Sequence, residues 1–240
     1  MKNNKFSASF AKKYYEKNYQ KFGRTFQRKY PNEELCRFIG RNFNKIKKNK
    51  RKNLKFLEVG CGGAGNLWMI AEEGFKTYGL DISKNSISIS KKIFKEKKLK
   101  SKFVISNMTK LPFKNNYFDC IIDVFSSTNL DLNEGNKFLK EVERTLKTGG
   151  LFFSYFPSKK SKLFKSKKKK MIDKNTIFNL KEKKSVFKIN NFPFRFHNKN
   201  EYKNLFKKHN FKIVYSEEIR KTYLNGQDNF DFLIFEGLKL

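Results

Sequence analysis

The chain has 240 residues, 38% of them hydrophobic, and a formal net charge of +33 from 55 lysines and arginines against 22 acidic residues. This length suits one α/β domain with a core of its own and small additions. No apolar run approaches the roughly 18 residues of a membrane span, and the N-terminus lacks the apolar stretch of a secretory signal, so we expect a cytoplasmic protein. Three scattered cysteines and two histidines, without metal-ligand spacing, predict no metal site.

The positive charge comes mainly from lysine, since only eight of the 55 basic residues are arginine. This balance, with abundant asparagine, isoleucine and phenylalanine, is typical of an AT-rich genome and favours a solvated lysine coat. The functional alternative is attraction to an anion, such as nucleic acid, a phosphorylated metabolite or an anionic membrane surface. Base-reading proteins depend on arginine for bidentate contacts, so its scarcity favours the first interpretation.

Residues 1–53 predict an N-terminal helical segment that is rich in aromatic and basic side chains. Pro31 marks a helix start, because proline is tolerated in the first turn and two acidic residues follow it. We interpret the tyrosines of this segment, Tyr15 and Tyr19 among them, as a cap over a substrate. A phenol there can bind a cation face-on or orient a hydroxyl group. Packing of the segment on the sheet edge is the equal alternative.

Strands and helices alternate through the middle of the chain. We expect strands near 55–60, 76–81, 102–107, 118–125 and 151–156, and helices near 66–74, 83–99 and 133–150. Alternation at this spacing predicts parallel strands with helices on both faces of the sheet.

The regular pattern breaks at residues 158–190, where the lysine-rich sequence is too polar for a core and predicts a mobile basic loop or lid. A helix near 198–211 and two strands near 212–218 and 229–239 follow it. The turn sequence NGQDN between these strands makes them antiparallel neighbours. The predicted fold class is therefore α/β, a Rossmann-like doubly wound sheet of about seven strands, mostly parallel with an antiparallel C-terminal strand pair.

The stretch FLEVGCGGAGN, residues 56–66, places Gly60, Gly62 and Gly65 in G-x-G-x-x-G spacing between a strand and a helix. Such a turn lets the backbone approach a ligand closely, and the helix N-terminus offers free N–H groups. Asp81 ends the next strand, 21 residues after Gly60, where a carboxylate can accept both hydroxyls of a ribose. This pattern fits NAD and S-adenosylmethionine equally.

Glu58, inside the apolar strand before the glycines, separates these two cofactors. A buried carboxylate repels the pyrophosphate of NAD, whereas it attracts the ammonium and sulfonium groups of S-adenosylmethionine. The antiparallel terminal strands are also not expected of an NAD-binding sheet. S-adenosylmethionine is therefore the predicted cofactor.

Four motifs in order, EVGCGGAG, GLDIS, LPFKNNYFDCIIDV and LKTGGLFF, resemble the class I S-adenosylmethionine-dependent methyltransferases. The resemblance covers residues 54–156 and, more weakly, 196–238. It implies a methyltransferase domain over residues 54–240, with the basic loop as an insertion and residues 1–53 as a separate cap.

The same resemblance implies which residues contact the cofactor. They are Glu58, Gly60, Cys61, Gly62, Gly65, Asp81, Ile82, Asn107, Met108 and Ser126. Glu58 would organise the methionine amino end, Asp81 would bind the ribose hydroxyls, and Ile82 would pack on the adenine. Asn107 stands where the family often has an acid, and its amide oxygen can still accept from the adenine amino group.

Methyl transfer depends on positioning the nucleophile, because the cofactor brings a good leaving group. A general base can help an alcohol or an ammonium to lose its proton. His197 is our candidate for that base, the alternative being a loop or helix-cap histidine. Ser126 and the residues after it follow the fourth strand, so this segment should face the methyl group.

This segment reads DVFSSTNL, and it lacks the Asn/Asp-Pro-Pro-aromatic motif of many methyltransferases that act on nucleobase amines. The proline-cysteine motif of pyrimidine C5 enzymes is absent as well. We therefore expect a small-molecule acceptor, an anionic one included, that is methylated on oxygen or nitrogen. The alternatives are an RNA-modifying methyltransferase that uses its lysines on phosphates, and a non-catalytic module that binds S-adenosylmethionine. The acceptor's identity and the oligomeric state lie beyond the sequence.

Overall fold

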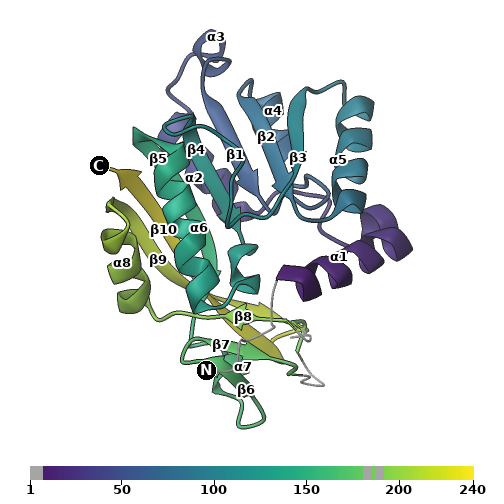
Figure 1. Cartoon of the computed structure of the whole chain (residues 1–240), viewed down its shortest axis with the longest axis vertical. Helices are drawn as coiled ribbons and strands as arrows, with labels where there is room; N and C mark the ends of the chain where they lie inside the picture. The colour runs from purple at the N-terminus through teal and green to yellow at the C-terminus, as the bar shows by residue number, and fades with distance from the viewer. Residues whose placement is uncertain (1–7, 181–184, 188–191) are drawn as a thin grey trace.

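A seven-stranded sheet in the order β3-β2-β1-β4-β5-β10-β9 forms the centre of the fold. The computed structural model describes residues 8–180, 185–187 and 192–240. The strands are β1 (Lys55–Val59), β2 (Lys76–Asp81), β3 (Ser101–Ile105), β4 (Phe118–Val124), β5 (Leu146–Pro157), β9 (Phe211–Tyr223) and β10 (Asp228–Lys239). Strands β1 to β5 pair in parallel, and β10 is antiparallel to both β5 and β9 (Figure 1). The predicted fold class is confirmed, including the antiparallel C-terminal pair.

Helices cover both faces of this sheet. They are α2 (Glu33–Phe43), α3 (Lys48–Arg51), α4 (Leu67–Glu72), α5 (Lys84–Glu96), α6 (Leu132–Thr145) and α8 (Lys199–Lys208). Neighbouring residues of β1 point to opposite faces, so Phe56 joins the core with α2 and α4, while Leu57 joins the core with α6 and α8. Figure 1 shows α6 in front of the sheet and α2 behind it. Burial on both faces explains why the strands read as nearly continuous apolar runs.

The N-terminal segment divides into two parts. Helix α2 packs in the core of the sheet, where the rings of Phe38 and Phe153 lie 4.8 Å apart. Its N-cap is Asn32, whose side chain accepts from two backbone N–H groups, so the helix starts two residues beyond Pro31. Helix α1 (Ala8–Phe22) and the short helix η1 (Gly23–Thr25) lie outside that core, and α1 packs against α5. We therefore restrict the cap to residues 8–31, which comprise α1, η1 and the chain that leads to α2.

The prediction of a loop at residues 158–190 is wrong for the part that the structure describes. This region contains α7 (Lys162–Lys165), β6 (Lys170–Asp173) and β7 (Thr176–Phe178), and β7 pairs with β8 (Phe194–Arg195) in a second, three-stranded sheet. The apolar residues between the lysines make the difference, because Leu163, Ile177 and Phe194 are buried in the same core as β10. Residues 181–184 and 188–191 lie outside the described part. We call β6, β7 and β8 the inserted sheet.

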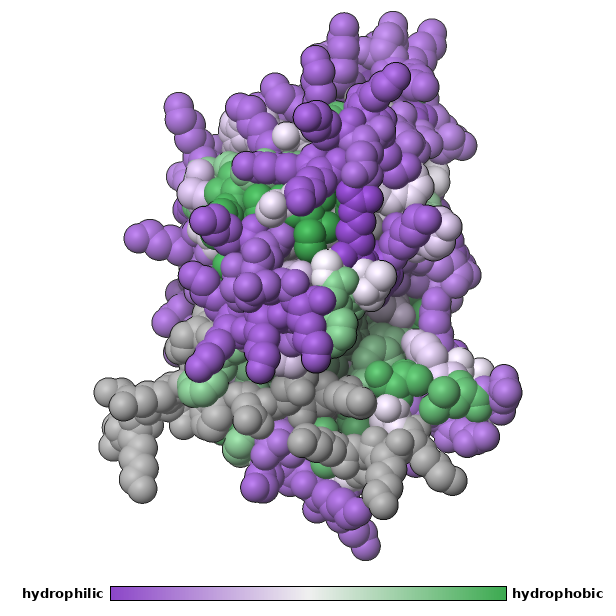
Figure 2. All heavy atoms as spheres, turned by 90° about the vertical axis from the view of Figure 1, so that its right-hand side faces the viewer, coloured by the Kyte–Doolittle hydropathy of each residue, from purple (hydrophilic) through white to green (hydrophobic). Residues whose placement is uncertain are grey.

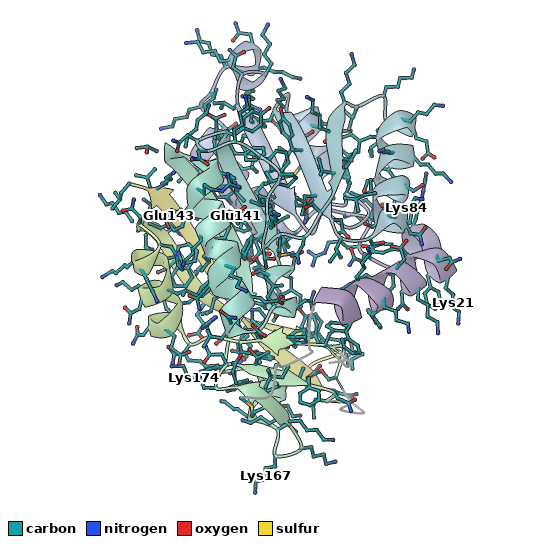
Figure 3. The ribbon with its side chains drawn as sticks, viewed as in Figure 1. Lys21, Lys84, Glu141, Glu143, Lys167 and Lys174 are labelled. Carbon is teal, nitrogen blue, oxygen red and sulfur yellow. The ribbon has the colours of Figure 1, made fainter. Side chains whose placement is uncertain are left out.

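Lysine side chains spread over the surface. Figure 2 shows that hydrophilic residues cover most of the face that carries α5 and α1. In Figure 3, Lys167 lies at the end of the inserted sheet that is furthest from the seven-stranded sheet, and it points away from the protein. Within the described residues, no helix combines the length and the apolarity needed to cross a bilayer.

Candidate cofactor and acceptor site

The glycine turn joins β1 to α4 and needs glycine for two reasons. Gly60 and Gly62 have φ angles of 63° and 52°, in the left-handed region that side chains disfavour. Other segments also approach the turn very closely. A Cβ atom on Gly60 would lie 2.4 Å from Ser126 Oγ, and one on Gly65 would lie 2.5 Å from the carbonyl oxygen of Arg28. The loop after β4 therefore packs against one side of the turn, and the segment that carries Arg28 packs against the other.

A cavity of about 280 Å³ opens beside this turn, at the carboxyl ends of β1, β2 and β4. Ligands of open α/β sheets bind at this edge. The predicted residues that line the cavity are Tyr15, Glu58, Gly60, Cys61, Gly65, Asp81, Ile82, Asn107, Met108 and Ser126. Gly62 is not among them. It leaves room for the cap to pack on the turn instead, since a Cβ atom there would lie 2.1 Å from Gln27 Oε1.

Glu58 presents a buried carboxylate to the cavity with one oxygen unused. Asn66 Nδ2 donates to Glu58 Oε1 over 2.6 Å, while Oε2 is buried without a hydrogen-bond partner among the described residues. Burial raises the pKa of Glu58 to about 8, and the hydrogen bond from Asn66 and the charge of Arg28 oppose that rise. A buried acceptor without a partner is costly, so this oxygen calls for a donor from a ligand.

Asp81 holds the glycine turn and faces the cavity at the same time. Its Oδ2 accepts from the backbone N–H of Gly62 over 2.9 Å, and its Oδ1 accepts from that of Ser83 over 2.8 Å. Burial raises its pKa, and these backbone donors oppose the rise. Each carboxylate oxygen accepts more than one hydrogen bond, so both oxygens can still accept from hydroxyl groups of a ligand.

A second group of lining residues comes from α1 and from the chain after β4, and consists of Tyr15, Phe125, Asn129 and Leu130. Asn129 Nδ2 donates to the Tyr15 hydroxyl over 3.0 Å, which joins α1 to the short helix η2 (Ser127–Asn129) after β4. Burial raises the pKa of Tyr15 far above its ordinary value, so its phenol keeps its proton and can donate it to a ligand. We call this part of the cavity, with its aromatic rings and one polar pair, the acceptor end.

Phe125 is the strained residue of the acceptor end. Its φ angle is 62°, an unusual value for a bulky side chain. The ring is held by an aromatic cluster, with Phe194 at 5.6 Å and Phe232 at 5.7 Å between ring centroids. Such strain is tolerated where surrounding packing determines it, and it is often found at functional sites.

Tyr19 does not line this cavity, contrary to its predicted place in a substrate cap. Its ring is 3% exposed and packs on Phe26, with the centroids 4.9 Å apart. Its hydroxyl group lies behind the glycine turn, 2.5 Å from where a Cβ atom on Gly62 would be. Tyr19 therefore packs the cap on the turn, while Tyr15, one helical turn earlier, reaches the cavity.

His197 is also placed away from the cavity, so it is not positioned as the general base. Its ring is buried between Phe156 and Tyr202, with centroids at 5.4 and 5.1 Å, and Asn175 Nδ2 lies 2.6 Å from its Nδ1. Burial lowers its pKa to about 4, although the side chain of Glu201 opposes this shift. The alternative interpretation, a loop or helix-cap histidine, gives its place in the chain, since His197 lies between β8 and α8 beside the N-cap Asn198, with its ring buried.

Sequence reasoning missed several residues that line the cavity. Asn66 directly follows the glycine turn, and its proximity to Glu58 in the chain was an available signal. Arg28 gave no such signal, because it comes from the cap and meets the cavity only in the folded chain. Asn129 belongs to the segment after β4 that the sequence placed at the site, and it lines the cavity.

A methyltransferase domain family matches residues 57–154 of this chain. The chain is 33% identical over 109 residues to sterol 4-C-methyltransferase strm-1 of Caenorhabditis elegans, a match that covers 43% of this chain and 31% of that protein. It is 34% identical over 106 residues to demethylmenaquinone methyltransferase of Geobacillus sp. (strain WCH70), covering 42% of this chain and 44% of that protein. The matched part thus spans less than half the length of these relatives.

The fold is similar to that of a solved structure over nearly its whole length. The structure of 1,6-didemethyltoxoflavin-N1-methyltransferase from Burkholderia thailandensis, with bound 1,6-didemethyltoxoflavin and S-adenosylhomocysteine, has a TM-score of 0.71 and 11% identity. The match covers 97% of this chain and 88% of that chain. At this identity the similarity shows the fold alone.

Proposed function

We propose that this chain, which belongs to the class I S-adenosylmethionine-dependent methyltransferase family, transfers a methyl group to an oxygen or nitrogen atom of a small-molecule acceptor. The observation that carries the proposal is the unpartnered Glu58 oxygen in a cavity that Asp81 also lines. The Glu58 carboxylate suits a cationic ligand group, and the Asp81 carboxylate suits a ribose diol.

The residues at this end of the cavity fit the cofactor group by group. Glu58 and Arg28 provide one acidic and one basic side chain, which suits the ammonium and the carboxylate of the methionine end. Asp81 would accept the ribose hydroxyls, and Ile82, Asn107 and Met108 line the part of the cavity left for the adenine. When bound, S-adenosylmethionine supplies an activated methyl group on a good leaving group.

The acceptor end lacks a strong base among the described residues that line it. The two carboxylates belong to the cofactor end, and the protonated Tyr15 hydroxyl can donate but not abstract a proton. The acceptor atom must therefore be nucleophilic by itself, as a neutral amine, a ring nitrogen or an already ionised oxygen is. The chain's own work is to orient that atom with Tyr15 and Asn129 and to exclude water with Phe125 and Leu130.

The high positive charge supports a second candidate, a methyltransferase that acts on RNA. No lysine of the described residues lines the cavity, and Lys167 lies at the far end of the inserted sheet. This distribution favours the small-molecule acceptor over RNA.

Two measurements test the proposal. Calorimetric titration should show binding of S-adenosylhomocysteine and no binding of NAD, and the reverse result would exclude the cofactor assignment. Release of S-adenosylhomocysteine should then be measured with a pool of small metabolites and, separately, with a pool of RNA. Turnover with the RNA pool alone would replace the small-molecule acceptor with nucleic acid.

A further inference from the structure

We propose that Arg195 is a positioning residue for the acceptor end of the cavity. It reaches from the inserted sheet to the backbone of residues 127–131, the segment that carries Asn129. This inference rests on the proposed function, because it assigns a role at the same cavity. Arg195 itself does not line the cavity and acts through the segment that it holds.

The guanidinium group holds that segment by two carbonyl oxygens. Arg195 Nη1 donates to the carbonyl oxygen of Asp131 over 2.9 Å, and Nη2 donates to that of Ser127 over 3.3 Å. In return, Thr128 Oγ1 donates to the backbone carbonyl oxygen of Arg195 over 2.9 Å. Three hydrogen bonds thus join a strand of the inserted sheet to residues 127–131, two of them to η2, across more than sixty positions of the chain.

Asp123 holds the same segment from the side of the main sheet. Its Oδ1 accepts from the backbone N–H groups of Ser126 and Ser127, each over 3.0 Å, and its Oδ2 accepts from the Ser127 hydroxyl. Arg195 therefore donates to backbone carbonyl oxygens of the segment, which the Asp123 carboxylate cannot bind because it only accepts hydrogen bonds. Between the two, η2 is fixed so that Asn129 reaches the Tyr15 hydroxyl.

The cost of this arrangement indicates that it serves more than packing. Arg195 is 1% exposed, and its guanidinium is absent from the ion pairs of the described residues. Burial lowers its pKa, although nearby carboxylates such as Asp123 oppose the fall. Its Nε has no hydrogen-bond partner among the described residues. A buried charge of this kind is expensive, and an apolar residue would fill the space more cheaply. A planar fork that spans two carbonyl groups is what arginine offers and lysine does not.

Gly135 gives independent support from another element. It lies in α6, although glycine is among the least favourable residues inside a helix. A Cβ atom on Gly135 would lie 1.1 Å from Arg195 Nη1, so this glycine leaves the space that the guanidinium occupies. Gly40 of α2, by contrast, has nothing within 4 Å of such a Cβ atom.

The two glycines provide a matched pair of variants in which Arg195 itself is unchanged, and Arg195→Met removes the guanidinium directly. The variants are Gly135→Ala, Arg195→Met and the control Gly40→Ala, each in the full chain. Hydrogen exchange is followed for peptides that cover residues 126–132 and, for comparison, β1. Calorimetry with S-adenosylhomocysteine reports the cofactor end, and turnover on the active fraction of the metabolite pool gives kcat and KM.

We expect exchange at 126–132 to become about tenfold faster in Gly135→Ala and in Arg195→Met, while β1 keeps its protection. Affinity for S-adenosylhomocysteine should stay within about threefold of the parent, since the hydrogen bonds that hold Glu58 and Asp81 come from Asn66, Gly62 and Ser83 and not from residues 127–131. The value of kcat should fall at least about tenfold, as expected when a reacting group is misplaced. Gly40→Ala should match the parent in all three measurements.

Two results would overturn the inference. One is unchanged exchange at 126–132 in both Gly135→Ala and Arg195→Met. The other is equal acceleration in β1 and 126–132, which would reduce Arg195 to a general contributor to stability. If the parent chain itself fails to bind S-adenosylhomocysteine, the proposed function fails, and the exchange measurement still decides whether Arg195 holds this segment.

Discussion

The two acidic side chains at the cofactor end of the cavity bind partners close to them in the chain, whereas the acceptor end joins residues that are far apart. Glu58 and its partner Asn66 are eight positions apart, and Asp81 accepts from Gly62, nineteen positions away. Tyr15 and Asn129, in contrast, are separated by 114 positions. The first set forms wherever one strand, one turn and the next strand fold together. The second needs the cap, η2 and the inserted sheet to meet.

The two ends also differ in what holds them. Backbone N–H groups bind Asp81, so the shape of the cofactor end follows from the path of the main chain. Side chains hold the acceptor end, since Asn129, Thr128 and Arg195 make its long-range contacts. A site held by side chains changes with single substitutions. Substitutions at the two ends should therefore have separable effects.

Asp81→Ala should give the largest effect, confined to cofactor affinity and stability. It removes hydrogen bonds to the ribose, each worth about 1.5–3 kcal/mol, so affinity for S-adenosylhomocysteine should fall about a hundredfold. Because Asp81 is buried and also binds Gly62 and Ser83, the variant should be less stable as well. Calorimetry and urea unfolding measure both. Asp119→Ala is the control, since that acid binds Lys147 outside the cavity, and equal losses in both variants would remove the ribose assignment.

Glu58→Gln should lower the same affinity about tenfold, because the amide keeps the Asn66 contact but loses the charge that attracts the ammonium. Because the pKa of Glu58 is raised to about 8, its side chain is protonated near pH 7 in the ligand-free chain. Binding of the ligand ammonium group should therefore release a proton, which calorimetry in buffers of different ionisation enthalpy measures. The release should vanish above about pH 9 and in the variant. Proton release that persists in Glu58→Gln would assign it to another group.

The same pKa sets how the stability of the ligand-free chain depends on pH. Burial raises the pKa of Glu58 from 4.5 to about 8, so the folded chain binds this proton more tightly than the unfolded chain does. Its contribution to the free energy of unfolding is therefore fully present below about pH 4.5 and declines as the pH rises towards 8. Glu58→Gln should flatten that decline in urea unfolding measured across this range. An unchanged pH dependence would contradict a protonated Glu58.

Tyr15→Phe should affect the acceptor end alone. The ring keeps its packing, while the hydroxyl that Asn129 orients is lost, so kcat/KM should fall about tenfold with affinity for S-adenosylhomocysteine unchanged. Tyr14→Phe is the matched control, because its neighbouring hydroxyl does not line the cavity. Steady-state kinetics with the active metabolite fraction decide the point. Equal losses in the two variants would show that the cap contributes only aromatic packing.

Replacing Lys167 and Lys168 by serine should have the smallest effect. Both side chains lie outside the cavity, and exposed substitutions of this kind change stability by less than about 0.5 kcal/mol. We expect kcat/KM to be unchanged at low and at high salt. A large loss at low salt that shrinks as salt is added would instead assign these lysines to electrostatic steering of an anionic acceptor.

The cofactor end was largely predictable because its chemistry lies in a short stretch of chain. The glycine spacing, Glu58 and Asp81 predicted S-adenosylmethionine, and the family and fold predictions are confirmed. The acceptor end was not predictable to the same degree. Tyr15 lines the cavity, but Tyr19, one turn further along α1, faces the back of the glycine turn, and His197 is buried in the core.

The sequence by itself determined the order of strands and helices in the seven-stranded sheet, the glycine turn and the acidic residues near the ends of β1 and β2, since apolar periodicity and glycine spacing act over a few residues. Only the tertiary structure decided that the lysine-rich region forms an inserted sheet, that Asn129 meets Tyr15, and that Gly135 leaves room for Arg195. These contacts join distant parts of the chain, and the free energy that selects them comes from packing of the whole core. No local pattern in the sequence records which distant side chain will fill a given space.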